Sequence, residues 1–499
     1  MKRNIIYILL FSLLLGQKAL FTACSDDYLD TAPSTSVSEN MIGKSIDNLY
    51  MALNGIHRKM VSQDMAVQYL GGYPGFMICM DASADDMTWA QDKEFKTTHQ
   101  WQLQSVPESA FTRTIWLSYY EFILNANLIL KYVDNFMESS PEKARHVKGE
   151  ALCFRAFSHF MLVQLYARRY VAGSENSQPG VPYRLVSGTT PMTRNSVEDC
   201  YRLINADLDA AIPLLEGYQP VSVSHFSHEV ACGLKARVAM AQQDYGSAAR
   251  YAKLAITEAE QRGFRLMAGN ELYNGFADIS TKTKEAMWAA LTLNDQTVNY
   301  YSFYALMSWN YNSEPVRTGV KQISSWLYDQ MAPTDLRRSW WDETGTLPLP
   351  TANFKAYPYS QRKFTARSTG DVVGNVAFMR LAELYLTAAE ALARNGQDAD
   401  ARQLFLQFVL TRDPGYQPAG AIGQDLIDEI MIHRRVELWG EGFRFYDLKR
   451  LNEPLDRKGS NFNAGFCMIL QAPASDPRWQ WAIPQDEMDA NPLMQQNEY

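Results

Sequence analysis

The chain has 499 residues, of which 46% are hydrophobic and 20% are charged. This balance is typical of a globular protein and excludes a disordered or fibrous chain. The formal net charge of −8 argues against a nucleic-acid-binding surface and against a polybasic membrane-binding surface, because both need an excess of lysine and arginine.

The first 23 residues have the pattern of a signal peptide. Lys2 and Arg3 precede an apolar run over residues 5–15, which is shorter than the roughly 20 residues that cross a bilayer. Small residues then lead into Cys24, as in a bacterial lipobox, where the cysteine thiol receives a diacylglyceryl group. We predict a signal peptide over residues 1–23 and lipidation of Cys24. The alternative is an ordinary secreted protein with an incidental cysteine.

The rest of the chain is predicted to form a tether and one domain. Residues 24–38 are polar, acidic and rich in turn formers, which favours a lipid-anchored tether. Residues 39–499 are expected to form a single, mainly α-helical domain, because helical periodicity dominates and no later segment is apolar enough to span a membrane. The long helices are expected over residues 45–61, 116–136, 142–166 and 197–215.

Two later segments have the pattern of tetratricopeptide-like helical hairpins, at residues 228–262 and 376–411. Small side chains in these helices allow close packing of the two helices of a pair. The glycines of the two connections, Gly246 and Gly396, are expected to end the first helix of each pair in a left-handed cap. The two hairpins are irregular and far apart, which favours a compact scaffold over a continuous solenoid.

Three segments lack helical periodicity: residues 71–108, 263–374 and 452–499. They are rich in aromatic, polar and turn-forming residues. Loops carried on a rigid helical frame are where binding residues usually lie. We therefore expect these irregular insertions to form a loop-rich ligand-binding face.

Several sequence motifs together resemble the SusD/RagB family of nutrient-binding outer-membrane lipoproteins of Bacteroidetes. The resemblance extends over nearly the whole chain and is strongest in the motif RRVELWGEGFRFYDLKR (434–450). The other motifs are CSDDYLDTAP (24–33), EALCFRAFSHF (150–160), FMRLAELYLTAAEA (378–391), AIPQDE (482–487) and the C-terminal QNEY.

The resemblance implies a tetratricopeptide-like helical scaffold with a loop-rich ligand face. It implies a SusC-like TonB-dependent transporter as partner and an oligosaccharide as ligand, or a peptide in some members. It also implies a cell outer membrane location, with the protein lipid-anchored and surface-exposed.

The charged residues of the 434–450 motif are predicted to form ion pairs rather than a catalytic site. Opposite charges stand three residues apart, which suits pairs within a helix or at its end. The sequence has no zinc-protease motif, phosphate loop or nucleophile elbow, so we predict no enzyme activity, no metal and no cofactor. The expected ion pairs are Arg434–Glu437, Glu441–Arg444 and Asp447–Arg450.

We predict structural roles for two other groups of residues, a set of aspartates and the cysteines. Asp81, Asp85 and Asp86 resemble the start of a calcium-binding loop, but Asp86 stands where such a loop needs glycine. Five cysteines remain besides Cys24, an odd number that cannot pair completely. We expect buried thiols, as at Cys153 and Cys232 in the helical patterns.

The candidate ligand-binding residues are mostly aromatic. Sugar rings present apolar C–H faces edged by hydroxyls, so they stack on Trp and Tyr while polar side chains bind the hydroxyls. Trp89 and Trp101 lie where the resemblance places a glycan-binding loop. The alternative is that these aromatic residues pack into a local core beneath their own loops. The remaining candidates are Asp295, Asn299, Tyr300, Tyr301, Tyr304, Trp309 and Tyr311.

Four functions follow from these observations. The first is a non-catalytic lipoprotein that captures oligosaccharide for a transporter, and the second is the same architecture with a peptide ligand. The third is a glycoside hydrolase, which would need two carboxylates about 5–10 Å apart in a cleft; no convincing pair is evident in the sequence. The fourth is a scaffold that binds only the transporter.

Overall fold

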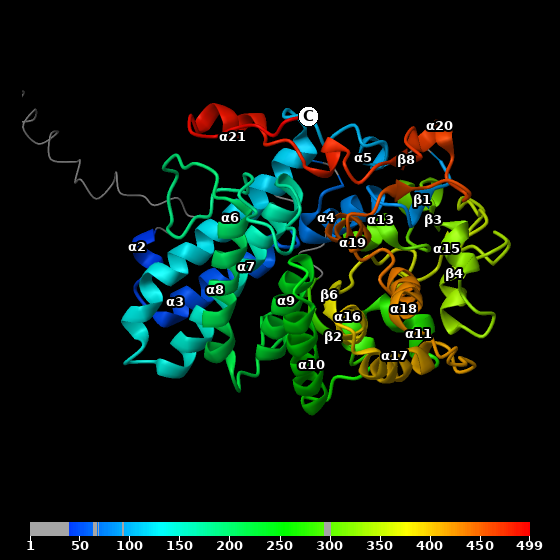
Figure 1. Cartoon of the computed structure of the whole chain (residues 1–499), viewed down its shortest axis with the longest axis horizontal. Helices are drawn as coiled ribbons and strands as arrows, with labels where there is room; N and C mark the ends of the chain where they lie inside the picture. The colour runs from blue at the N-terminus through cyan, green and yellow to red at the C-terminus, as the bar shows by residue number, and fades with distance from the viewer. Residues whose placement is uncertain (1–38, 63–66, 68, 92–93, 294–300) are drawn as a thin grey trace, which may run out of the picture.

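The computed structural model describes residues 39–499 apart from residues 63–66, 68, 92–93 and 294–300. The predicted signal peptide, Cys24 and the tether lie outside the described residues. Figure 1 shows the long helices of the first half of the chain at the left and centre, and strands β1, β3 and β4 with several short helices at the right. Within the described ranges, no helix is both long and apolar enough to cross a membrane. The mainly α-helical fold predicted from the sequence is confirmed.

Four long helices form where hydrophobic periodicity predicts them. Each buries an apolar face in a shared core; in α3, for example, Leu49, Leu53 and Ile56 are buried. The side chain of Ser45 accepts a hydrogen bond from the backbone N–H of Asn48, which fixes the start of α3. The helices are α3 (Ile46–Lys59), α6 (Ala110–Tyr132), α7 (Pro141–Tyr166) and α8 (Val197–Leu215).

The two predicted helical hairpins are present, and helix α10 packs against both α9 and α16. Gly396 has the left-handed conformation expected at the end of α16, with φ of +73°. In the first hairpin the prediction for Gly246 was wrong, because Gln243 is the left-handed residue, with φ of +62°. Asp244 caps the N–H of Ser247, so α10 begins before Gly246. The helices are α9 (His228–Ala241), α10 (Tyr245–Gln261), α16 (Leu381–Arg394) and α17 (Asp398–Arg412).

The irregular segments contain more regular structure than the sequence indicated. Helix α4 (Gly72–Ala82) is buried on all sides, so its sequence has no polar face and no helical period. A four-stranded antiparallel sheet has the order β1-β3-β5-β4. Its strands are β1 (Met87–Trp89), β3 (Lys321–Ile323), β5 (Ser360–Gln361) and β4 (Trp341–Asp342).

The remaining elements are short, except for helix α18. Strand β2 (Ala286–Ala289) pairs antiparallel with β6 (Ala377–Arg380), which leads directly into α16. The helices are α2 (Glu39–Ile42), α5 (Lys96–His99), α11 (Glu271–Asn274), α12 (Ile279–Lys282), α13 (Phe303–Met307), α14 (Glu314–Thr318), α15 (Ser325–Asp329), α18 (Gly423–Glu437), α19 (Arg444–Leu451), α20 (Ala464–Cys467) and α21 (Gln485–Ala490). Strands β7 (Leu455–Asp456) and β8 (Gln471–Ala472) pair, and the 3-10 helices are η2 (Val133–Phe136), η3 (Gly275–Ala277), η5 (Leu336–Trp340) and η6 (Pro477–Trp479).

The 434–450 motif forms ion pairs, but mostly not the predicted ones. The Asp447–Arg450 pair is confirmed, with Oδ1 and Nε 2.8 Å apart. Arg434 instead pairs with Asp447 at 2.8 Å. The motif carries no free pair of carboxylates, because Asp447 is bound to arginines of the motif and its two glutamates are bound to cations from other segments. Glu437 binds Arg337, Arg380 and Arg412; Glu441 binds Lys363 and Arg380; Arg444 binds Asp85.

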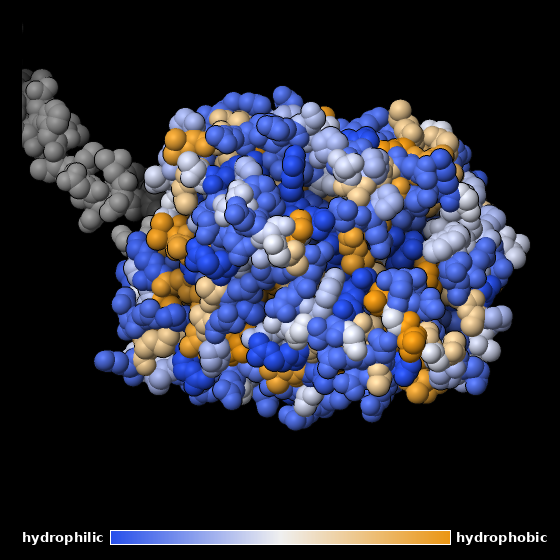
Figure 2. All heavy atoms as spheres, viewed as in Figure 1, coloured by the Kyte–Doolittle hydropathy of each residue, from blue (hydrophilic) through white to orange (hydrophobic). Residues whose placement is uncertain are grey.

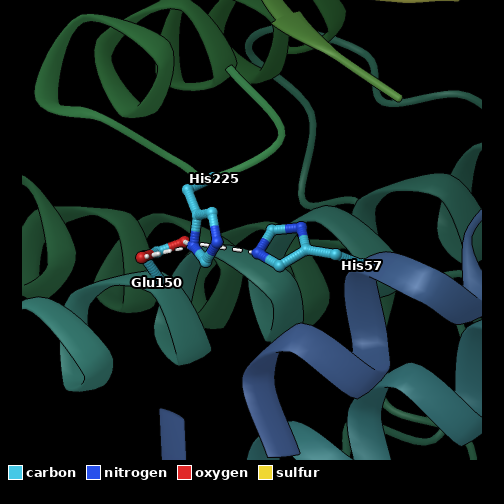
Figure 3. Close-up of side chains that lie close together, drawn as sticks. All are labelled: His57, Glu150 and His225. Atoms are coloured by element: carbon cyan, nitrogen blue, oxygen red, sulfur yellow. Dashed lines mark hydrogen bonds and ion pairs between the residues drawn. The ribbon is translucent and has the colours of Figure 1, made fainter. Parts of the chain in front are cut away.

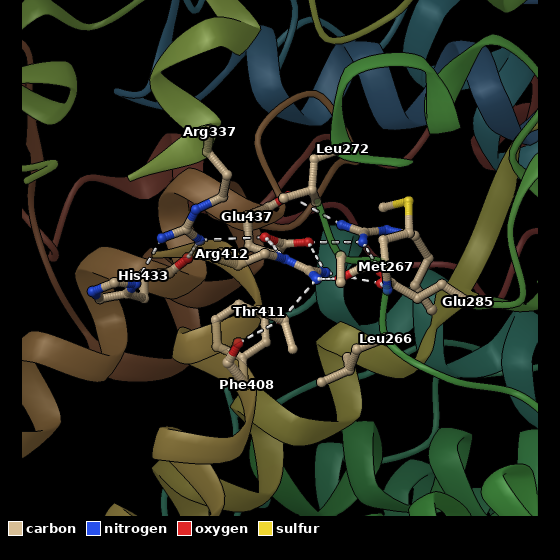
Figure 4. A network of polar contacts seen from close by, with 12 residues as sticks. Leu266, Met267, Leu272, Glu285, Arg337, Phe408, Thr411, Arg412, His433 and Glu437 are labelled. Atoms are coloured by element: carbon tan, nitrogen blue, oxygen red, sulfur yellow. Dashed lines mark hydrogen bonds and ion pairs between the residues drawn. The ribbon is translucent and has the colours of Figure 1, made fainter. Parts of the chain in front are cut away.

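Glu437, Glu441 and four of their cation partners join two further acids in one buried ion network, shown in part in Figure 4. Arg412 Nη2 lies 2.9 Å from both Glu285 Oε2 and Glu437 Oε1, and Arg337 Nη1 lies 3.3 Å from Glu437 Oε2. The network contains four cations and four anions, so its charges balance. Its members are Glu285, Asp335, Arg337, Lys363, Arg380, Arg412, Glu437 and Glu441.

The carboxylates of the aspartates that resemble a calcium loop are bound to other groups of the protein. Arg444 Nε lies 2.7 Å from Asp85, and Arg435 Nη2 lies 2.6 Å from Asp86. Asp81 accepts a hydrogen bond of 2.8 Å from the N–H of Gly442. All three aspartates therefore connect the α4–β1 segment to the 434–450 motif. The five cysteines of the described part of the chain are free and buried, as predicted.

Two buried histidines are expected to make stability depend on pH. His159 has Nδ1 bonded to the carbonyl of Arg155 and Nε2 accepting from the N–H of Arg184, and burial lowers its pKa to about 3. Burial and the guanidinium of Arg337 likewise lower the pKa of His433 to about 3. The unfolded chain has histidine pKa values near 6.5, so it binds more protons than the folded chain between these values. The free energy of unfolding should therefore fall as the pH falls below about 6.5.

The expected loss between pH 7.5 and 5.5 is about 1.4 kcal/mol for each such histidine. Urea unfolding at the two pH values should show this fall in the unmodified protein. The variant His159→Gln should show a pH dependence smaller by about that amount. An equal pH dependence in both proteins would contradict the assignment of a neutral His159.

Candidate functional site

The predicted ligand-binding residues fall into three groups. Asp295, Asn299 and Tyr300 lie outside the described residues. Trp89, Trp101 and Tyr304 are buried, and the half-buried residues of the set are Tyr301, Trp309 and Tyr311.

The three buried aromatic residues belong to the core, which corrects their assignment to an exposed face. Trp89 is part of strand β1 and packs against Phe95 and His99. The indole N–H of Trp101 donates to the carbonyl of Ser83 at 2.8 Å, and the hydroxyl of Tyr304 donates to the carbonyl of Phe276 at 2.7 Å. In this structure these side chains have no ring face available for a ligand. The alternative that aromatic loops form local cores applies to these three.

Contacts made by Trp309 and by the next residue, Asn310, hold Trp309 at the surface. Its indole N–H donates to Thr365 Oγ1 at 3.0 Å, and the guanidinium carbon of Arg362 lies 4.2 Å from its ring centroid. The next residue, Asn310, bonds through its side chain to both the N–H and the carbonyl of Ala366. These contacts fix the orientation of the indole ring without burying it completely.

A small hollow lies beside Trp309, between helix α14 and the loop that leads to β5. Its volume is about 20 Å³, which is room for a single small group and not for a sugar ring. The hollow formed by these described residues could therefore hold only the edge of a larger molecule. The described residues that line the hollow include no Asp or Glu. They include Trp309, Val316, Lys321, Lys355, Gln361 and Arg362.

Two further tyrosines, which are partly exposed, lie beside described candidate or hollow residues and were missed from the sequence. Tyr69 packs edge-on against Tyr301 with ring centroids 5.8 Å apart. The hydroxyl of Tyr357 accepts a hydrogen bond of 2.7 Å from Gln91. The preceding residue, Ala90, lies just after β1 and donates its N–H to the carbonyl of Val320 beside the hollow. We call Tyr69, Tyr301, Trp309, Tyr311 and Tyr357 the aromatic rim; all five are partly exposed. Tyr357 lies within the segment 263–374, whose high aromatic content was the available signal.

A larger concave region lies elsewhere, with a volume of about 510 Å³. It is formed by the loop after α7, the end of α19 and residues 474–480. Arg169 Nε donates to Asn452 Oδ1 at 3.0 Å, and Lys449 beneath it donates to three backbone carbonyls. None of the described residues predicted to bind ligand lines this cavity, and the one aromatic residue of its described lining, Trp479, is buried. Its walls are mainly charged and polar, unlike the aromatic rim.

The surface seen in Figure 2 is mainly hydrophilic, with hydrophobic residues in small separate groups. This face therefore offers no broad apolar area of the kind that permanent protein partners bury.

Comparisons with known proteins match nearly the whole chain. A family model described as "Starch-binding associating with outer membrane" matches residues 27–240, and the SusD family model matches residues 244–499. A SusD-like protein P38 from Formosa agariphila is 22% identical, with 91% of this chain and 92% of that protein covered.

Solved structures agree with these matches. A SusD superfamily protein from Bacteroides thetaiotaomicron has a TM-score of 0.78 at 22% identity, covering 91% of this chain and 100% of that one. A SusD-like carbohydrate binding protein from Bacteroides vulgatus also has a TM-score of 0.78 at 22% identity, covering 90% of this chain and 97% of that one. With the fold and both halves of the sequence in agreement, the chain belongs to the SusD family.

Proposed function

We propose that this protein is a non-catalytic surface lipoprotein that captures an oligosaccharide and delivers it to a SusC-like TonB-dependent transporter. Cys24 would carry the lipid that holds it at the outer membrane, and residues 25–38 would form the tether. The observation that carries the proposal is the aromatic rim: partly exposed rings, fixed by hydrogen bonds and ring contacts, on the loop-rich side of a SusD-family chain.

The chemistry of the rim suits a sugar chain. Trp309 and the rim tyrosines offer flat apolar faces, and Arg362, Lys355 and Gln91 supply donors for hydroxyl groups near them. The hollow that the described residues form at Trp309 is shallow, which favours recognition of several sugar units lying side by side. Relatives point the same way, since one matching family model is described as starch-binding and one structural neighbour as carbohydrate binding.

Catalysis is not part of the proposal. A glycoside hydrolase needs two carboxylates across a cleft. Among the described residues that line the hollow at Trp309, none is acidic. The acids of the 434–450 motif are bound within ion pairs and have no open position for substrate.

Substitution of the rim is expected to weaken glycan binding. A glycan array would identify a ligand, and isothermal titration calorimetry would then compare the unmodified protein with Trp309→Ala and Tyr301→Ala. Loss of a central aromatic contact costs about 1–2 kcal/mol, so each variant should bind roughly tenfold more weakly. Thermal melting of each variant would verify that the fold is retained.

Matched controls separate the rim from the other surfaces. Trp326 is an exposed tryptophan outside the rim, so Trp326→Ala should bind glycan normally. Arg169→Ala alters the 510 Å³ cavity and should also leave binding unchanged. Binding that survives Trp309→Ala but is lost in Arg169→Ala would overturn the rim as the site. Binding of peptides and of no glycan would favour the alternative ligand class.

A further inference from the structure

Three side chains from distant parts of the chain converge beneath the surface of the helical half, as Figure 3 shows. His57 comes from α3, Glu150 from α7 and His225 from the segment before α9. His57 Nε2 lies 3.4 Å from Glu150 Oε2, and His225 Nδ1 lies 3.0 Å from the same oxygen. One ligand atom from each residue lies within 4.8 Å of the others.

The two distances from Glu150 match the edges of a metal coordination shell. Zn²⁺ binds imidazole nitrogen and carboxylate oxygen at about 2.0–2.1 Å, usually with tetrahedral geometry. Ligand atoms on such a tetrahedron stand about 3.3 Å apart. The two measured distances to Glu150 lie close to this value on either side. Two imidazoles with one carboxylate also suit zinc better than calcium or magnesium, which prefer oxygen ligands alone.

The cluster lacks a protein cation that would balance its carboxylate. The Glu150 side chain is fully buried, and within the described part of the chain no Lys or Arg forms an ion pair with it. His57 Nε2 is buried and makes no hydrogen bond among the described residues, although it points toward Glu150. A buried carboxylate beside a nitrogen that makes no hydrogen bond is costly unless a cation or a proton is held between them.

Surrounding groups hold the three side chains in place. The N–H of Phe226 and the hydroxyl of Tyr218 both donate to the carboxylate of Glu150, at 3.0 and 3.1 Å. The hydroxyl of Tyr50 lies 3.5 Å from Nε2 of His225, the ring nitrogen that faces away from Glu150. Such outer contacts orient metal ligands and fix the histidine tautomer.

We propose that His57, Glu150 and His225 form a binding site for Zn²⁺, with a solvent molecule completing the coordination. The ion would join α3, α7 and the segment before α9 in the helical half of the protein. This site is separate from the aromatic rim and independent of glycan capture. It would therefore contribute to stability and not to ligand selection.

The test uses purified protein without a polyhistidine tag, stripped of metal with EDTA. Calorimetric titration with ZnCl₂ should show one tight site, and Zn²⁺ should raise the melting temperature. His57→Ala and His225→Ala should each weaken Zn²⁺ binding by about tenfold or more and should remove the Zn²⁺-dependent rise in melting temperature. His228→Ala, next to the cluster in sequence but outside it, should keep both effects.

A purely structural cluster predicts a different pattern. In that case the His57 variant would melt at a lower temperature, but by the same amount in EDTA and in Zn²⁺. Cobalt substitution in the unmodified protein gives a second measurement, because Co²⁺ at a tetrahedral nitrogen and oxygen site absorbs visible light strongly. The absence of that absorption, or an equal Zn²⁺ response in the His57→Ala/His225→Ala double variant, would overturn the proposal.

Discussion

Replacing Glu437 by Gln is expected to lower the free energy of unfolding by about 3–5 kcal/mol, the range measured when one partner of a buried ion pair is removed. The substitution keeps the shape of the side chain and removes its charge. Arg337, Arg380 and Arg412 would then share the buried network with one anion fewer. Urea unfolding followed by tryptophan fluorescence would measure the loss.

A matched surface substitution shows whether burial is the cause. Glu343 pairs with Arg338 at 3.2 Å, and its side chain is 53% exposed. Glu343→Gln should change stability by no more than about 1 kcal/mol. Removing Arg412 together with Glu437, as in Glu437→Gln/Arg412→Leu, should cost less than the sum of the single variants, because charge balance is restored. Additive losses would show that the network does not act as a unit.

Replacing Gly442 by Ala is expected to cost about 2–5 kcal/mol, the sum of backbone strain and overpacking. Gly442 has φ of +82°, and a Cβ atom here would lie 2.7 Å from the Cα of Met77. Because that neighbour is backbone in the buried helix α4, it cannot move aside as a flexible side chain would. The loss would be measured by the same urea unfolding experiment.

A second glycine separates the two contributions. Gly173 has a similar φ of +76°, but nothing lies within 4 Å of the place where its Cβ would be. Gly173→Ala should therefore cost only the strain, about 1–2 kcal/mol. Equal losses in the two variants would mean that contact with α4 contributes nothing at Gly442.

The long helices could be predicted from the sequence because each has one apolar and one polar face. Helix α8 begins and ends where its periodicity does, at Val197 and Leu215. Helix α4 was not predicted, because all of its side chains are buried and no polar face marks its turns. The left-handed position at Gln243 was also missed, since the cap formed by Asp244 decides where α10 begins.

The ion pairs of the 434–450 motif could not be assigned from spacing alone. Arg434 and Glu437 share helix α18, but Glu437 meets guanidinium groups from three distant segments in the interior. Opposite charges three residues apart can pair within one helix. A buried acid instead pairs with the cations that compensate its charge most completely, even where they come from distant segments.

The sequence could not show which of the candidate aromatic residues are exposed. Burial of Trp89 follows from its place in strand β1 beside β3, a long-range pairing that the local sequence does not specify. Tyr69 and Tyr357 reach the rim through contacts with Tyr301 and Gln91, far away in the chain. The ligand role of the rim stays a prediction.

The buried ion network anchors the segment 263–374 at several internal points, through Glu285, Arg337 and Lys363. The rim residues Trp309 and Tyr357 belong to the same segment but take no part in the network. Substitutions at the outer positions can therefore accumulate during evolution while the inner anchors preserve the frame. A library that randomises the rim and retains these anchors would be a practical starting point for engineering new ligand preferences.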